Sequence, residues 1–268
     1  MIDKYLEDVN ERLKVFDMFH FEEEPHIYWW LDENGERQQA TTSMTALIHD
    51  HSQPFDAKKI APFSARKLGL TVQEVLDKWE YENHFAKIKG THIHAFNEYL
   101  WQGKDYTYPI DKVKAEFNGV DVLKPVWEQL KKIALDFYNK YQDRIIPVGL
   151  ELVIGDEELK ICGSIDFLCF SKKLNSLIIV DYKSNKEIKL EPYKGQKMTG
   201  CLSHLDDCNY IHYSLQLNGY QYILEKKTGL KLNNEHFLIW MNENNDTYEI
   251  FKTKDLYYEA KMMLEERK

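Results

Sequence analysis

The sequence has few cysteines, no long apolar run and no excess of positive charge. Its 268 residues include four cysteines, too few for a disulfide framework in a chain of this size. No apolar stretch approaches the length of a membrane span, and the first residues lack a signal-peptide pattern. These absences argue against a disulfide-stapled secreted module or a membrane protein, and we expect a cytoplasmic location.

The formal net charge of −9 argues mildly against strong nonspecific binding to nucleic acid. It does not exclude a nuclease, because a site that holds a metal ion needs carboxylates. Local basic clusters exist, and one of them leaves directly from Lys183 with Lys186, Lys189, Lys194 and Lys197. This cluster either tracks phosphates or forms a solvated face.

The chain shows no internal repeat and no low-complexity linker. Thr71 and Glu74 form a capping box that predicts a helix start, and Asn118-Gly119 predicts a break before the next helix. The expected elements are a hairpin within 26–45, helices from 71, at 85–101 and 122–141, a strand at 148–154, a hairpin at 159–183, a helix at 210–227, strands at 236–240 and 247–251, and a helix from 255. This order predicts an α/β fold with a central mixed β-sheet flanked by helices.

We divide the chain into an N-terminal β-hairpin and helical extension, residues 1–84, and a core, residues 85–268. The extension is expected to pack on the core, so that both form one continuous globular domain.

Two apolar segments around residues 159–170 and 177–183 are separated by a polar, turn-prone stretch, which predicts a hairpin. If the loop is 172–175, Ser171 pairs with Ser176, and Asp166 then lies opposite Asp181. Opposed residues of an antiparallel pair point to one face, with Cβ atoms about 4.5–5.5 Å apart. Lys183 lies two positions beyond Asp181 and shares that face.

This arrangement brings two carboxylates and one ammonium together in an apolar surrounding. Burying two like charges is costly unless a cation neutralises them. Lys183 supplies one positive charge, and a hard divalent cation such as Mg²⁺ supplies two more. The set fits metal-assisted phosphodiester hydrolysis, in which Asp166 and Asp181 bind the ion and Lys183 orients or activates water. The alternative is a salt-bridged pair at the end of a sheet.

Other candidates come from spacing on helices and strands. His94 and Glu98 are four residues apart and project from one side of a helix, and a neutral imidazole is a good metal ligand. Gln216 and Tyr220 repeat this spacing and could contact a phosphate or a base. Glu151 precedes the hairpin and could face the same site. A hydrogen-bonded histidine, an amphipathic helix and an edge carboxylate are the respective alternatives.

Cys201, His204, Cys208 and His212 carry side chains of the type that zinc prefers. Their spacing is not that of a standard zinc finger, so a packed connection remains the alternative.

Together, these motifs resemble the PD-(D/E)XK nuclease superfamily, and within it the RecB-like exonuclease branch with its phage-type and mitochondrial members. The matching pieces occur in the family's order: Gly90-Thr91-His92-Ile93-His94-Ala95-Phe96-Asn97-Glu98, Gly163-Ser164-Ile165-Asp166, Val180-Asp181-Tyr182-Lys183-Ser184-Asn185, and Gln216-Leu217-Asn218-Gly219-Tyr220. The resemblance covers about residues 90–230. It implies a restriction-endonuclease-like core.

The resemblance also implies roles for individual residues. Asp166, Asp181 and Lys183 would be catalytic, and Lys183 would position or help deprotonate the attacking water. The metal, Mg²⁺ or Mn²⁺, would be bound by His94, Asp166, Asp181 and the backbone carbonyl of Tyr182. Secondary or substrate-contacting positions would be Glu151, Gln216, Tyr220, Ser184 and Lys186. Because no cysteine follows Cys208, we expect no iron–sulfur cluster, and Asp181 stands where many relatives have glutamate.

The resulting hypothesis is a metal-dependent DNA exonuclease acting in recombination, repair or phage DNA metabolism. Its partners would be DNA, with single-stranded or duplex ends, and a recombination or single-strand-binding protein. The alternatives are a structure-selective or nicking endonuclease, RNA as the substrate, and an inactive nucleic-acid-binding module of the same fold.

Overall fold

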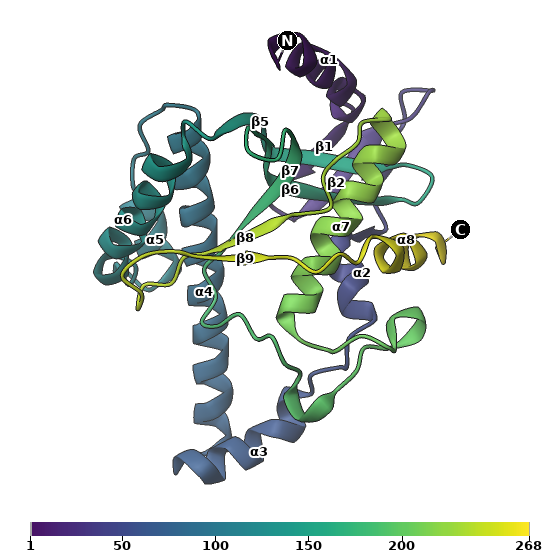
Figure 1. Ribbon diagram of the computed structural model, residues 1–268. Helices are drawn as coiled ribbons and strands as arrows, with labels where there is room; N and C mark the ends of the chain where they lie inside the picture. Colours follow the sequence, from purple (N-terminus) through teal and green to yellow (C-terminus); the bar gives the residue numbers. More distant parts are fainter. Residues whose placement is uncertain (1, 268) are drawn as a thin grey trace.

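We describe residues 2–267 in a computed structural model (Figure 1). The middle of the fold is formed by three neighbouring strands: β5 (Ile145–Asp156), β6 (Ile161–Ser171) and β7 (Ser176–Lys183). Their Ile, Val and Phe residues suit a buried sheet. Ser171 pairs with Ser176, which confirms the predicted register and the turn at 172–175. Asn175 closes this turn with a φ of 49°, a left-handed conformation that asparagine tolerates.

The main sheet is mixed, as predicted. It is completed by three short strands: β4 (Thr42–Ser43), β8 (Phe237–Trp240) and β9 (Glu249–Lys252). The strand order is β4-β6-β7-β8-β9, with β5 also paired to β6. β4 is parallel to β6 and β7 is parallel to β8, whereas the other pairs are antiparallel.

Helices cover both faces of this sheet (Figure 1). Alternate β7 residues enter two different cores: Leu177 and Ile179 pack in one, Ile178 and Val180 in the other. The first core is covered by α1 (Ile2–Leu13), α2 (Met44–Asp50), α7 (Asn209–Thr228) and α8 (Tyr257–Glu265). The second is covered by α4 (Val72–Trp101) and α6 (Lys124–Tyr141). The fold is therefore α/β with helices on both sides, consistent with the expected restriction-endonuclease-like core.

The N-terminal region contains the predicted hairpin; helices α1 and α2 and a third strand are among the elements there that sequence reasoning missed. The small antiparallel sheet consists of β1 (Phe19–Glu22), β2 (Ile27–Leu31) and β3 (Arg37–Gln39). Its turn is fixed by Asp32, whose carboxylate accepts hydrogen bonds from the backbone N–H groups of Asn34 and Glu36. Phe19 and Trp30 anchor this sheet in the first core.

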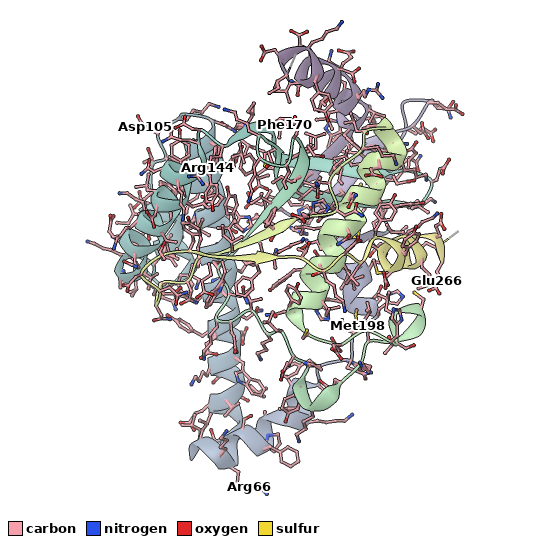
Figure 2. All side chains as sticks on the ribbon, in the orientation of Figure 1. Arg66, Asp105, Arg144, Phe170, Met198 and Glu266 are labelled. Carbon is pink, nitrogen blue, oxygen red and sulfur yellow. The ribbon has the colours of Figure 1, made fainter. Side chains whose placement is uncertain are left out.

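Helix α4 differs from the prediction. The capping box at Thr71 and Glu74 is confirmed, but the expected break near residue 85 is wrong, because one helix of 30 residues runs to Trp101. The proposed boundary at 84/85 thus falls inside α4, and the division into extension and core stays a prediction. α3 (Ala57–Leu68) packs on the first turns of α4, and the two project from the sheet, with Arg66 near the tip (Figure 2).

The remaining elements are α5 (Ile110–Glu116) and three 3₁₀ turns, η1 (Lys14–Phe16), η2 (Tyr193–Gly195) and η3 (Gly200–Leu202). None of the helices described between residues 2 and 267 combines the length and the hydropathy needed to cross a membrane.

A buried histidine links the sheet to α7. His236 accepts a hydrogen bond from the Ile179 N–H at Nδ1, and its Nε2 lies 2.8 Å from Gln221 Oε1. Because Nδ1 accepts a hydrogen bond from the Ile179 N–H, it carries no proton. His236 is therefore neutral, with its proton on Nε2, which donates to Gln221. Burial lowers the pKa of His236 from 6.5 to about 4, since a charged ring would lose solvation, and the carboxylates of Asp255 and Glu225 offset this only in part.

This arrangement predicts a pH-dependent stability. An unfolded histidine binds a proton below about pH 6.5, whereas folded His236 resists it down to about pH 4. Stability is therefore complete above pH 6.5 and falls as the pH drops towards 4, by up to about 3 kcal/mol. Urea unfolding at pH 7 and pH 4.5 measures this loss. His236→Gln should flatten the slope, and His204→Gln, at an exposed histidine, should not; equal slopes in both variants would contradict the prediction.

Candidate active site

The main sheet opens where β7 leaves β6. The last pair between these strands is Phe167 with Val180, although β7 continues beside β8 as far as Lys183. Because β5 occupies one edge of β6, the other edge is shared by β7 and by β4, which pairs only with Ile161 and Cys162. Among the described strands, none pairs with β6 residues 163–166 on that edge. We call the space between this stretch and β7 residues 181–183 the fork.

Asp166 closes the fork from the β6 side. Its Oδ2 accepts a hydrogen bond of 2.9 Å from the backbone N–H of Tyr182, so a carboxylate takes the place of the absent ladder partner. Asp181 lies one position beyond Val180 on β7, but the ladder ends at the pair Phe167–Val180, so the predicted pairing of Asp166 with Asp181 is not part of it. Burial alone would raise the pKa of Asp166, but His94, Lys183 and the Tyr182 N–H together lower it. Asp166 is therefore an anion.

His94 reaches the fork from α4, which lies on the face of the sheet opposite to α7. Its Nε2 donates to the Tyr182 carbonyl at 2.8 Å, because a carbonyl can only accept. Its Nδ1 lies 3.3 Å from Asp166 Oδ2 and 3.7 Å from Glu151 Oε1. Burial opposes a charge on His94, but the two carboxylates raise its pKa well above 6.5. The protonated ring thus places a positive charge between two carboxylates. A metal ion that binds here would replace the proton on Nδ1.

Glu151 completes this group through an unusual backbone conformation. It lies opposite Asp166, between the pairs Leu150–Phe167 and Leu152–Ile165, and its φ is 45°. Such a left-handed residue inside a strand costs on the order of 1–3 kcal/mol. Burial raises the pKa of Glu151. Its carboxylate, the carboxylate of Asp166 and the His94 ring offer three ligand atoms within 4.8 Å of one another.

Asp181 and Lys183 form a buried ion pair beside these three residues. Lys183 Nζ lies 2.5 Å from Asp181 Oδ2, yet this oxygen has no partner with hydrogen-bond geometry. Burial raises the pKa of Asp181 to about 6, and Asp166 adds to this shift. Burial would lower the pKa of Lys183, but the two aspartates outweigh it and raise the value. The structure thus groups Glu151 with His94 and Asp166; metal binding by Asp181 stays a prediction.

Helix α7 supplies the other side of the fork. Gln216 Oε1 lies 3.5 Å from Lys183 Nζ, and Gln216 Nε2 donates to the hydroxyl groups of Tyr220 and Thr45, each at 3.2 Å. The ammonium of Lys183 also lies over the ring of Tyr213, 4.6 Å from its centroid. Gln216 and Tyr213 therefore contact the ammonium of Lys183 from α7, in addition to its ion pair with Asp181.

Two of these residues, Thr45 and Tyr213, were missed by sequence reasoning. Tyr213 could have been found, because it stands three positions before Gln216 on the same helical face. Thr45 lies in the first turn of α2, far away in sequence, and nothing in its surroundings distinguishes it.

Tyr220 is buried at the fork and does not extend to the surface. Its side chain is 3% exposed, and a Cβ built on Gly163 would lie 2.6 Å from its ring. Gly163 is thus needed for close approach of β6 to α7. The predicted contact of Tyr220 with a nucleic-acid strand stays a prediction.

The other predicted positions surround the fork. Glu98 accepts a hydrogen bond from Gln102, one turn of α4 beyond His94. Ser184 is buried directly after β7, and Lys186 is exposed in the loop that follows. Their substrate contacts stay predictions.

Comparisons with known proteins give structural neighbours only. No family model matches the chain, and no curated protein matches it. A protein from Eubacterium rectale named "Putative exonuclease" is 18% identical over 66% of this chain and 64% of its own length, with a TM-score of 0.40; the chain thus spans less than two thirds of that protein. The protein SSO0001 is 13% identical over 100% of this chain and 85% of its own, with a TM-score of 0.32. These TM-scores are too low to transfer a fold or a function.

Divalent metal is expected to stabilise the fold through the fork. His94, Glu151 and Asp166 converge only in the folded chain, so a cation bound there adds to the free energy of unfolding, by about 2.7 kcal/mol at 100 times its Kd. Thermal unfolding with and without Mn²⁺ measures this effect. Asp166→Asn should abolish the shift, whereas Glu98→Gln, at a neighbouring carboxylate, should keep it. An undiminished shift in Asp166→Asn would rule out this site.

The Gly163–Tyr220 contact gives a separate prediction. Gly163→Ala should reduce stability by about 1–3 kcal/mol, because the new methyl group overlaps the ring. The cost should shrink when Tyr220→Leu removes the ring, which a double-mutant cycle of urea unfolding measures. Equal costs in both backgrounds would mean that the ring is not the obstacle.

Proposed function

We propose that this protein is a metal-dependent deoxyribonuclease that hydrolyses phosphodiester bonds from DNA ends. The observation that carries the proposal is the convergence of His94, Glu151 and Asp166 at the fork, directly beside the buried Asp181–Lys183 pair. Isolated ion pairs are common, but this set combines a possible cation site with a fixed ammonium group. The order of the sequence motifs, which resembles the RecB-like branch, supports the same class of reaction.

The donor atoms suit Mg²⁺ or Mn²⁺. Carboxylate oxygens are the ligands of hard cations, and one imidazole is compatible with Mn²⁺. The carboxylate of Asp181, which is ion-paired with Lys183 through Oδ2, brings a further anionic group to the same place. His94, Glu151 and Asp166 would hold the ion, with Asp181 adjacent to it. When bound, such an ion polarises a phosphoryl oxygen and offsets developing negative charge.

The chain's own residues then have distinct tasks. Lys183 remains an ammonium group because Asp181 and Asp166 stabilise its charge, and Gln216 holds it in place. A charged lysine donates hydrogen bonds, so its task is to orient the attacking water and the scissile phosphate. Asp181 balances the charge of Lys183, and its predicted contact with the ion is part of this proposal.

Features beyond the fork support a nucleic-acid substrate. The chain that leaves β7 carries exposed lysines at 186, 189 and 194, which can neutralise phosphates although the protein has a net charge of −9. DNA rather than RNA, digestion from ends, and a role in recombination, repair or phage DNA metabolism with a recombination or single-strand-binding partner are parts of this proposal. They rest on the resemblance of the motifs.

Replacing the lysine tests the mechanism. Lys183→Ala should lower kcat by at least about 10²–10³-fold on end-labelled linear DNA in Mg²⁺ or Mn²⁺, the cost of removing one preorganised donor. Lys132→Ala, at an exposed lysine of α6, serves as the matched control and should retain activity.

The same assay distinguishes the alternatives. An exonuclease should spare covalently closed circular DNA, whereas cleavage of the circle would establish the endonuclease alternative. DNA binding without cleavage of any substrate in Mn²⁺ would establish the inactive binding module. Undiminished cleavage by Lys183→Ala would refute the role of the fork.

A further inference from the structure

A second group of metal-ligating side chains lies away from the fork. His51 follows α2, Cys201 lies in η3, and Glu266 follows α8. Their ligand atoms all lie within 4.8 Å of one another. Three separate parts of the chain, distant in sequence, therefore present an imidazole, a thiol and a carboxylate to one point.

The histidine is oriented as a ligand. His51 Nδ1 lies 2.9 Å from the Leu47 carbonyl, and since a carbonyl only accepts, Nδ1 carries the proton. The lone pair of the neutral ring is then on Nε2, which faces Glu266 Oε2 at 3.8 Å. Ligating histidines in proteins are held in this way, with the second ring nitrogen donating to a carbonyl or carboxylate.

The backbone brings the cysteine close to this ring. The His51 carbonyl accepts a hydrogen bond of 2.7 Å from the Thr199 N–H. Gly200 follows with a φ of 59°, and a Cβ there would lie 3.3 Å from His51 Cδ2. The segment thus passes over the imidazole just before Cys201, where glycine provides both the conformation and the space.

The three side chains are spaced as ligands of one cation. A carboxylate oxygen and an imidazole lone pair are both acceptors, so a cation between them would bind to both. In a tetrahedral zinc site with bonds of about 2.0–2.3 Å, neighbouring ligand atoms are roughly 3.3–3.7 Å apart. The observed separation of 3.8 Å between Nε2 and Oε2 is close to this value.

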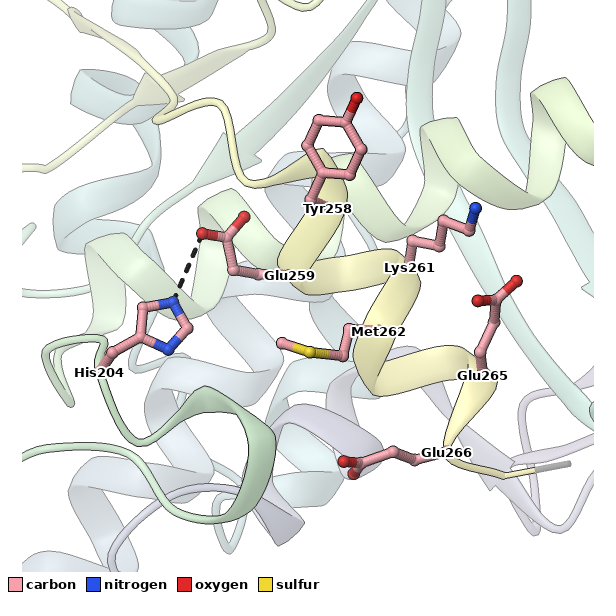
Figure 3. A pocket seen from close by; sticks show the side chains of 7 residues that line it. All are labelled: His204, Tyr258, Glu259, Lys261, Met262, Glu265 and Glu266. Carbon is pink, nitrogen blue, oxygen red and sulfur yellow. Dashed lines mark hydrogen bonds and ion pairs between the residues drawn. The ribbon is translucent and has the colours of Figure 1, made fainter.

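The zinc set considered from sequence does not form. His204 pairs with Glu259 at 3.5 Å and His212 with Asp207 at 2.7 Å, so neither ring joins Cys201. Figure 3 shows Glu259 of α8 directed at His204, whereas Glu266, which follows the end of α8, is not directed at it. The residues that lie near Cys201 in the folded chain, His51 and Glu266, are distant from it in sequence.

We propose that His51, Cys201 and Glu266 bind one Zn²⁺ ion, with water in the fourth position. Thiolate, imidazole and carboxylate are the ligands of zinc, whereas Mg²⁺ avoids sulfur. The ion ties α2, η3 and the end of α8 together. This proposal is independent of the nuclease reaction, because the site shares no residue with the fork.

Cobalt replaces zinc as a spectroscopic probe. Titration of metal-free protein with Co²⁺ should produce a thiolate-to-cobalt charge-transfer band at one equivalent, and Zn²⁺ should displace it. Cys201→Ser should abolish the band. Two controls should retain it: Cys208→Ser, which removes a buried thiol of the same connection, and Asp166→Asn, which alters the fork.

Glu266→Gln tests the site without touching the core, because this side chain is 53% exposed. It keeps the thiolate and the band but should weaken Co²⁺ binding by more than the 10–100-fold that the loss of an outer-shell partner costs. If Cys201→Ser does not fold, this variant decides. No band in the wild type, a band that survives in folded Cys201→Ser, or unchanged affinity in Glu266→Gln would each overturn the proposal.

Discussion

The hydrogen bond from the Tyr182 N–H to the carboxylate of Asp166 allows the rest of the site to exist. When β7 turns away from β6, a buried backbone N–H loses its ladder partner, at a cost of about 1–3 kcal/mol if it stays unpaired. Asp166 supplies the acceptor. Because this hydrogen bond offsets the cost of separating the strands, the Tyr220 ring can pack against Gly163. The Tyr220 hydroxyl accepts a hydrogen bond from Gln216, which in turn contacts Lys183. A carboxylate that would serve in chemistry thus also supports the architecture.

Charge balance explains why this opening favours a cation. Glu151, Asp166 and Asp181 would bring three negative charges, while protonated His94 and Lys183 bring two positive ones. Burial raises the pKa values of Glu151 and Asp181, and the nearby carboxylate of Asp166 adds to both shifts. If a divalent ion displaces the His94 proton into solvent, the formal sum becomes zero. A proton on His94 and a metal ion are therefore alternative ways of compensating the same acids.

Local patterns in the sequence were sufficient for part of this site. A polar turn between two apolar segments fixed the hairpin register, and a spacing of four identified Gln216 with Tyr220. The position of Glu151 depends on a left-handed backbone at one strand residue, for which glutamate gives no signal. The continuity of α4 also escaped prediction, because its middle turns are stabilised by tertiary packing rather than by a clear apolar stripe. Long-range sets such as His51, Cys201 and Glu266 arise only when distant helix ends meet.

Helix α2 connects the two proposed metal sites while keeping their chemistry separate. Near its first turn Thr45 accepts a hydrogen bond from Gln216, and after its last turn His51 faces Cys201 and Glu266. Met44 packs on Gly219 of α7, where a Cβ would lie 2.6 Å from its sulfur, so α2 cannot shift without moving α7. Zinc at one end would thus stiffen the support of Lys183 without entering the reaction. The fork offers mainly oxygen ligands and the second site includes a sulfur ligand, and such donor sets prefer different metal ions. Each site can therefore bind or release its ion without depending on the other.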